Sequence, residues 1–124
     1  MTNLTKKVLI VEDDKDFLWI LKQSFVDKGF SVVFAEDGEE GLRIAEEEKP
    51  DLILLDILMP KMDGIAVAGK LKEKGIKSKI IFLTNLKGKL PVAEGLVQDD
   101  DYIVKSDLHV DQIVAIVKNR LDIK

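Results

Sequence analysis

The chain has no cysteine and only one histidine, His109, among its 124 residues. Without thiols it can form no disulfide, thiolate zinc site, cysteine nucleophile or iron–sulfur cluster, and one imidazole cannot build a multi-histidine metal site. No apolar run approaches the roughly 18 residues of a membrane span, and the first residues lack the apolar segment of a signal peptide. We therefore expect a cytoplasmic protein that makes no membrane contact.

An excess of positive charge is also absent. The chain has 19 basic and 23 acidic side chains, which gives a formal net charge of −4. Sequence-independent binding to nucleic acid requires a basic surface, so we expect no direct nucleic-acid contact by this chain. Its hydrophobic content of 46% is ordinary for a soluble globular protein. The length predicts one domain over residues 1–124, with a core that needs no metal or disulfide support.

Apolar residues follow two alternating patterns along the chain. Short apolar runs and β-branched runs are typical of strands, whereas apolar residues three and four positions apart are typical of helices. The predicted strands are Val8–Val11, Phe30–Ala35, Leu52–Leu55, Lys79–Leu83 and Tyr102–Val104. The predicted helices are Lys15–Lys28, Glu39–Glu48, Ile65–Lys74, Leu90–Val97 and Asp107–Leu121.

Strands that alternate with helices in this way predict an α/β fold. Strands that are apolar on both faces imply a parallel sheet covered by helices on both sides, and right-handed crossovers leave few topologies. We therefore expect a doubly wound, flavodoxin-like parallel sheet of five strands with five helices. We adopt for it the strand order 2-1-3-4-5 that is general for flavodoxin-like sheets.

Chemically active side chains follow four of the predicted strands. Glu12 and Asp13 follow the first strand and Asp56 follows the third. Thr84 follows the fourth strand and Lys105 the fifth. Ligands of open α/β sheets bind beyond the carboxyl ends of the strands, near the point where the strand order reverses. We therefore expect these side chains to converge at one edge of the sheet.

The chemistry of this group points to a phosphoryl receptor. Neighbouring carboxylates repel one another, and a bound cation or an ammonium offsets that cost. Mg²⁺ takes one or two carboxylates together with phosphate oxygens, while Lys105 supplies a positive charge and Thr84 a hydroxyl donor. Asp56 is then free to act as a nucleophile. Taken singly, each of these residues has a plainer interpretation as a helix cap, a strand end or a surface charge.

Four segments together carry a more specific pattern than any single residue. They are VLIVEDD (residues 8–14), DLILLDILMPKMDG (residues 51–64), IIFLT (residues 80–84) and DDYIVK (residues 100–105). With these segments, residues 7–121 resemble the receiver domain of two-component response regulators. The resemblance implies a phosphorylation-dependent signalling switch that catalyses only its own phosphotransfer and dephosphorylation. It implies a phosphohistidine donor on a sensor histidine kinase or a histidine phosphotransfer protein, and it leaves the output partner unknown.

The resemblance also implies a role for each acidic residue. Asp56 is the phosphoryl acceptor and one of the ligands of Mg²⁺. Asp13 binds the metal directly, and Glu12 acts mainly through a bound water. The backbone carbonyl of Leu58 completes the metal site.

The same resemblance assigns the switch. Thr84 is the hydroxyl that moves toward the phosphoryl group, Lys105 pairs with that group, and Tyr102 is the aromatic residue that turns inward as Thr84 moves. The predicted helix Leu90–Val97 contains a proline and a glycine, so we expect it to be a helix of low stability. With Tyr102 and the last helix it would form the output surface.

The chain departs from the family pattern after two of these residues. Ser106 stands where the family usually has a proline after the lysine. A cis bond before serine would cost roughly 2.5–4 kcal/mol, so we expect a trans peptide bond between Lys105 and Ser106, with a strained cis bond held in place by the site as the alternative. Asn85 stands where the family usually has a small residue, and both changes can alter reaction rates.

The first predicted helix carries apolar residues outside its expected core face. In this family the helical hairpin of the kinase packs on this helix, so we predict that Leu18 and Trp19 are exposed and contact the kinase. Isolated surface apolar residues without a partner remain the alternative. The expected core face consists of Phe17, Ile20, Leu21 and Phe25.

Two other functions stay open at this point. A phosphatase of the haloacid-dehalogenase type also uses an aspartate nucleophile with Mg²⁺, but it requires a second acid two positions after Asp56, where this chain has Leu58. An interaction module of the same fold that works without phosphate is the main alternative. A dinucleotide site is disfavoured because no G-x-G-x-x-G follows the first strand.

Overall fold

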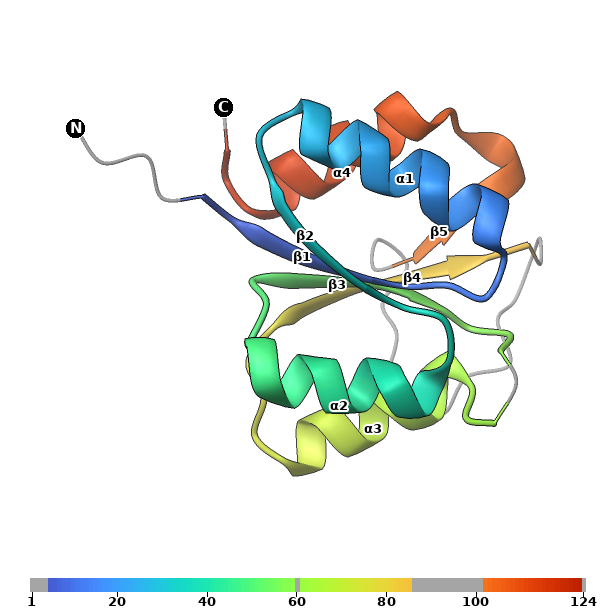
Figure 1. Cartoon of the computed structure of the whole chain (residues 1–124), viewed down its shortest axis with the longest axis vertical. Coiled ribbons are helices and arrows are strands. Elements are labelled where there is room, and N and C mark those ends of the chain that lie inside the picture. Colours follow the sequence, from blue (N-terminus) through green and yellow to red (C-terminus); the bar gives the residue numbers. More distant parts are fainter. Residues whose placement is uncertain (1–4, 60, 86–101, 124) are drawn as a thin grey trace.

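Five parallel strands form one sheet in the order β2-β1-β3-β4-β5 (Figure 1). The computed structural model describes residues 5–59, 61–85 and 102–123. The strands are β1 (Lys7–Val11), β2 (Ser31–Ala35), β3 (Leu52–Asp56), β4 (Lys79–Thr84) and β5 (Tyr102–Val104). The helices are α1 (Lys15–Asp27), α2 (Gly38–Glu48), α3 (Gly64–Glu73) and α4 (Val110–Arg120), with a 3-10 turn, η2, at Lys105–Asp107.

The expected sheet and its strand order are confirmed. Within the described residues there are four α-helices rather than five, and the predicted helix Leu90–Val97 lies outside those residues. The last helix begins at Val110, later than expected, because Lys105–Asp107 form the 3-10 turn and His109 is the N-cap residue.

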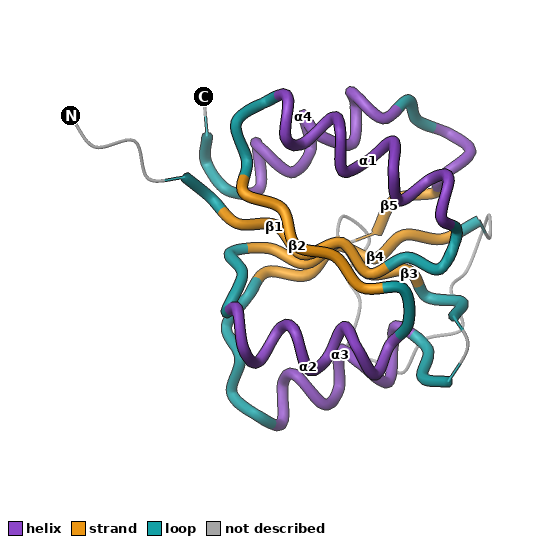
Figure 2. The backbone as a smooth tube through the Cα atoms, viewed as in Figure 1, coloured by secondary structure: helices purple, strands orange, loops and turns teal. Residues whose placement is uncertain are grey.

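Helices cover both faces of the sheet (Figure 2), and an apolar cluster holds each pair of helices in place. α1 and α4 cover one face, where Leu21 and Phe25 pack with Val114 in one buried cluster. α2 and α3 cover the other face, where Ala45 and Leu71 belong to a second cluster. Every residue of β3 is buried. Burial on both faces explains why all its residues before Asp56, the last one, are apolar.

Aspartates start three of the helices at the carboxyl edge of the sheet. The side chain of Asp14 accepts the backbone N–H groups of Asp16 and Phe17 at the start of α1. Asp37 and Asp63 cap α2 and α3 in the same way. Such caps satisfy N–H groups that have no partner within the helix. Of the three successive acids that follow β1, the third is therefore a cap, and the first two remain for the site.

Candidate functional site

The carboxyl ends of β1, β3, β4 and β5 bring the predicted site residues together. Carboxylate oxygens of Glu12, Asp13 and Asp56 all lie within 4.8 Å of one another. Glu12 is fully buried and Asp56 is 4% exposed, whereas Asp13 is exposed to solvent. Thr84, at the end of β4, is also fully buried, and Lys105 follows β5 directly.

Lys105 connects the two buried carboxylates. Its ammonium forms an ion pair with Glu12 Oε1 and lies 3.2 Å from Asp56 Oδ2. The side chain is only 10% exposed. The ammonium also lies 5.1 Å from the ring centre of Phe17, within the range of a cation–π contact. The ring and the two carboxylates therefore fix the position of the charge.

The electrostatics of the site favour a proton on Asp56 in the metal-free protein. Burial, followed by the hydrogen bond and the negative charge of Glu12, raises the pKa of Asp56 from 3.8 to about 8, although Lys105 acts to lower it. Burial alone would lower the pKa of Lys105, but the hydrogen bond to Glu12 and the charges of Asp56 and Glu12 leave it raised. The ammonium of Lys105 thus stays charged, and Asp56 takes up a proton when no other cation is bound beside it.

A hard divalent cation such as Mg²⁺ fits this donor set. The three side chains offer only carboxylate oxygens, which such cations prefer. Glu12 Oε1 is buried and, among the described residues, interacts with Lys105 alone. The other oxygen, Oε2, accepts the N–H of Asp14 at 3.1 Å, so the carboxylate is held in one orientation. Leu58, whose carbonyl is the expected fourth ligand, lies in the exposed turn after β3.

Close backbone contacts position the turn that follows Asp56. A Cβ atom on Gly64 would lie 2.2 Å from the carbonyl oxygen of Asp56, and one on Gly38 would lie 2.0 Å from that of Met62. The N–H of Gly64 also donates to the carbonyl of Ile57 at 2.9 Å. Only glycine fits at these two positions, which accounts for the glycine that ends the motif of residues 51–64.

The predicted switch residues lie on the two neighbouring strands at this edge. Thr84 is paired in register with Val104, and Tyr102 with Phe82. Tyr102 is partly buried and packs against the apolar cluster on the α2 and α3 side. The described peptide bonds are all trans, so the bond between Lys105 and Ser106 is trans, as expected.

The prediction for α1 was wrong for two of its residues. Leu18 is 6% exposed and belongs to the core, whereas Ile20 is 49% exposed. α1 packs against α4 as well as the sheet, so its buried face follows Leu18, Leu21 and Phe25, and Ile20 lies nearly opposite Leu18 around the helix. Trp19 is 60% exposed, so exposure was predicted correctly for Trp19 and wrongly for Leu18.

Sequence reasoning missed the contact of Phe17 with Lys105. Phe17 was expected only in the core, and its spacing on α1 gives no sign of a second contact. A signal exists in its position, since the third helical residue after an N-cap that follows β1 lies beside the carboxyl edge of the sheet.

In the described part of the chain, no helix is long and apolar enough to cross a membrane.

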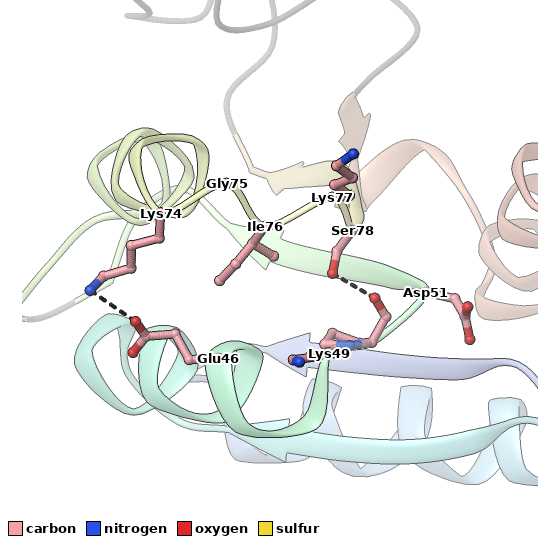
Figure 3. Close-up of a pocket in the computed structure, with 9 residues that line it drawn as sticks. Glu46, Lys49, Asp51, Lys74, Gly75, Ile76, Lys77 and Ser78 are labelled. Carbon is pink, nitrogen blue, oxygen red and sulfur yellow. Dashed lines mark hydrogen bonds and ion pairs between the residues drawn. The ribbon is translucent and has the colours of Figure 1, made fainter.

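A separate hollow lies at the opposite end of the strands (Figure 3). It measures about 660 Å³ and is lined by residues at the ends of α2 and α3, including Lys49 and Ile76. Lys74 pairs with Glu46 at 2.8 Å across it, and the Ser78 hydroxyl donates to the carbonyl of Pro50. None of the predicted site residues lines this hollow.

Sequence comparisons agree with this arrangement. The family model of the response regulator receiver domain matches residues 8–118. The chain is 39% identical over 103 residues to the alkaline phosphatase synthesis transcriptional regulatory protein PhoP of Bacillus subtilis, covering 82% of this chain and 43% of that protein. It is 36% identical over 115 residues to the transcriptional regulatory protein DltR of Streptococcus agalactiae, covering 92% and 51%. The chain thus spans about half the length of these curated relatives.

Solved structures share the fold over nearly the whole chain. A CheY-like response regulator receiver domain protein from Methanospirillum hungatei is similar with a TM-score of 0.85 and 30% identity, covering 96% of this chain and 95% of that one. The response regulator protein TrrA of Thermotoga maritima, solved in complex with Mg²⁺ and BeF, is similar with a TM-score of 0.81 and 33% identity, covering 93% and 98%.

Proposed function

This chain belongs to the response regulator receiver domains of two-component signalling, and from that premise we propose that it is a phosphorylation-dependent switch with Asp56 as phosphoryl acceptor. One observation carries the proposal. The Asp56 carboxylate lies at the end of β3 in contact with Lys105, beside two further carboxylates that can hold a divalent cation.

Asp56 is the best placed nucleophile of the three acids. Glu12 is fully buried and paired with Lys105, and Asp13 is exposed at the rim. In the proposed step Asp56 reacts as the ionised carboxylate: its proton passes to solvent, one of its oxygens attacks phosphorus, and the P–N bond to the donor histidine breaks. The imidazole leaves with the electron pair of that bond, and Asp56 becomes an acyl phosphate. Lys105 stabilises the negative charge on the phosphoryl oxygens, so positioning and charge neutralisation supply most of the acceleration.

We propose Mg²⁺ as the cofactor of this step. Glu12, Asp13 and Asp56 would hold it, with the backbone carbonyl of Leu58 as a further ligand. When bound, the metal would neutralise charge on the phosphoryl oxygens. The proposal is supported by the oxygen-only donor set and by the complexes with Mg²⁺ and beryllium fluoride described for TrrA and for a CheX–CheY pair of Borrelia burgdorferi, the latter 30% identical to this chain.

The proposed output is a shift between two conformations. Thr84 would move toward the phosphoryl group, and Tyr102, on the neighbouring strand, would follow it inward. Thr84 follows Leu83, the residue that pairs with Asp56 in register, and Tyr102 pairs with Phe82 earlier on the same strand.

We propose a sensor histidine kinase or a histidine phosphotransfer protein as the donor, with Trp19 of α1 as a contact. The relatives named as transcriptional regulators are about twice as long as this chain, so an output through DNA would depend on a part that the matched region does not contain. We propose no enzymatic activity beyond phosphotransfer to Asp56 and its reversal by hydrolysis.

The proposal is tested with a small phosphoryl donor. The chain is incubated with Mg²⁺ and acetyl phosphate, and in parallel with beryllofluoride, and the adduct is located by intact mass and ¹⁹F NMR. Asp56→Asn should abolish both adducts. Asp63→Asn is the matched control, because asparagine also caps helices well, and it should form them normally.

Two outcomes would contradict the proposal. A folded chain that forms no adduct with either reagent would favour an interaction module that works without phosphate. Continuous release of phosphate without a lasting adduct would favour a phosphatase.

A further inference from the structure

One of the two edge strands of the sheet is β2, which runs between α1 and α2 (Figure 1). One side of β2 forms backbone hydrogen bonds to β1 and to the residues next to β1. The N–H of Ser31 donates to the carbonyl of Lys6, and the carbonyl of Ala35 accepts the N–H of Glu12. Alternate residues of a strand direct their backbone groups to opposite sides. Val32 and Phe34 therefore direct their N–H and C=O groups away from the sheet.

This edge lacks the usual protection against pairing with another strand. Exposed edges in natural proteins commonly carry charged residues or proline within the strand, and Ser31–Ala35 contains neither. Phe34 is 40% exposed on the strand, and beside it α1 exposes Trp19 at 60% and Val26 at 48%. A hollow of about 340 Å³ lies along the same strand, lined in part by Val33 and by Arg43 of α2.

We propose that the β2 edge is a self-association surface, on which β2 of a second copy of this chain pairs antiparallel across a two-fold axis at Val33. This inference is independent of phosphoryl transfer at Asp56.

The arrangement of groups along the edge is self-complementary. With Val33 opposite itself, Val32 lies opposite Phe34 of the second copy, and the outward backbone groups of both pairs meet in hydrogen bonds. Pairs of aromatic and β-branched residues of this kind stabilise antiparallel strands. On the α2 side, Arg43 and Glu47 are one helical turn apart and paired at 3.2 Å, so a two-fold axis can place each beside the opposite charge of the other copy.

Lys22 limits the strength of this pairing. Its ammonium lies 4.7 Å from the ring centre of Phe34 and 6.0 Å from that of Trp19, and among the described residues no ion pair involving it is found. Two copies would bring two such ammoniums to the same side of the paired strands. Because Phe34 lies off the axis, the charges stay apart and added salt screens them. We therefore expect weak association that strengthens with salt.

The absence of cysteine permits a test of the register. In Val33→Cys the two thiols would face each other at a non-hydrogen-bonded pair, with Cα atoms about 4.5 Å apart, a separation that a disulfide spans. In Phe34→Cys the equivalent atoms lie diagonally, about 7–8 Å apart, beyond that reach. Under mild oxidation Val33→Cys should form dimers at least tenfold faster than Phe34→Cys. Equal rates, or faster linkage of Phe34→Cys, would overturn the proposal.

Sedimentation equilibrium tests the association itself in the unmodified chain. Phe34→Lys should raise the dimer dissociation constant at least tenfold, and Lys22→Gln should lower it several-fold. Ile20→Lys is the matched control, since Ile20 is as exposed as Val26 but lies on the other side of α1 from Lys22, and it should leave the constant unchanged.

Circular dichroism establishes that each of these variants is folded. A chain that stays monomeric to millimolar concentration in high salt overturns the proposal, and so does capture of another protein's strand by a chain that does not self-associate. A dimer that is insensitive to Phe34→Lys also overturns it.

Discussion

Replacing Asp56 with asparagine should stabilise the metal-free protein. The unfolded chain ionises Asp56 near its ordinary pKa of 3.8, whereas the folded chain holds the proton up to about pH 8. At pH 7 the ionisable residue therefore costs the folded state up to roughly 4 kcal/mol over the intervening 3 pH units. The asparagine avoids this cost, but its buried amide loses hydrogen bonds to water, at about 1–3 kcal/mol. We expect a net gain of about 1–3 kcal/mol.

The pH dependence gives the sign of the effect. Below about pH 4 both states of the wild-type chain are protonated at Asp56, so the advantage of the variant disappears. It grows as the pH rises, because only the unfolded state ionises, and it levels off above about pH 8, where the folded state ionises too. Mg²⁺ should reverse the order, since it stabilises the wild-type chain by binding to the folded state.

Urea unfolding at several pH values, with EDTA or with Mg²⁺, measures both effects. Asp63→Asn is the control, since it changes a carboxylate to an amide at an exposed cap. An Asp56→Asn variant that is less stable than the wild-type chain in EDTA at pH 7 would refute the reasoning. An advantage that does not change between pH 4 and pH 8 would refute it as well.

Substitutions at four further positions test other parts of the structure. Gly64→Ala should destabilise the chain by about 2 kcal/mol or more and weaken Mg²⁺ binding, because the new Cβ meets the carbonyl of Asp56. Urea unfolding measures the stability and Mg²⁺ titration the binding, and an unchanged unfolding midpoint would contradict the prediction. Lys105→Met should cost about 3 kcal/mol in EDTA, since it leaves the buried carboxylate of Glu12 without its cation. Lys105→Arg is its control, and equal loss in both variants would exclude the charge as the cause. Trp19→Ala should change stability by less than about 0.5 kcal/mol but slow phosphotransfer from the cognate kinase. Leu18→Ala should instead lose about 2–4 kcal/mol of stability. Unchanged phosphotransfer with Trp19→Ala would exclude the docking role of Trp19.

The sheet could be predicted from the sequence because its strands are apolar on both faces and separated by helices. The grouping of Glu12, Asp56 and Lys105 followed from the same topology, since the carboxyl ends of parallel strands meet at one edge. The pattern of short apolar runs predicts the parallel sheet, whereas the strand order that groups the site residues was adopted from flavodoxin-like folds. The structure adds the distances, the shared ammonium and the raised pKa of Asp56.

The orientation of α1 could not be predicted in the same way. Apolar residues occur at successive positions from Phe17 to Leu21, so more than one face of the helix is apolar enough to be buried. The packing of α4 against α1 decides between them, and that contact joins segments far apart in the chain. The later start of α4 has a similar origin, because the 3-10 turn at Lys105–Asp107 places Lys105 beside the carboxylates before the helix begins.

The tight fit of Gly38 and Gly64 has a consequence for the turn between Asp56 and α3. Each end of this turn lies against backbone that a single methyl group would displace. Insertions or deletions between residues 57 and 63 should therefore be absent from working variants, even though Leu58, Lys61 and Asp63 are exposed. In a selection for random length changes, this surface loop should tolerate fewer of them than the turn between α3 and β4.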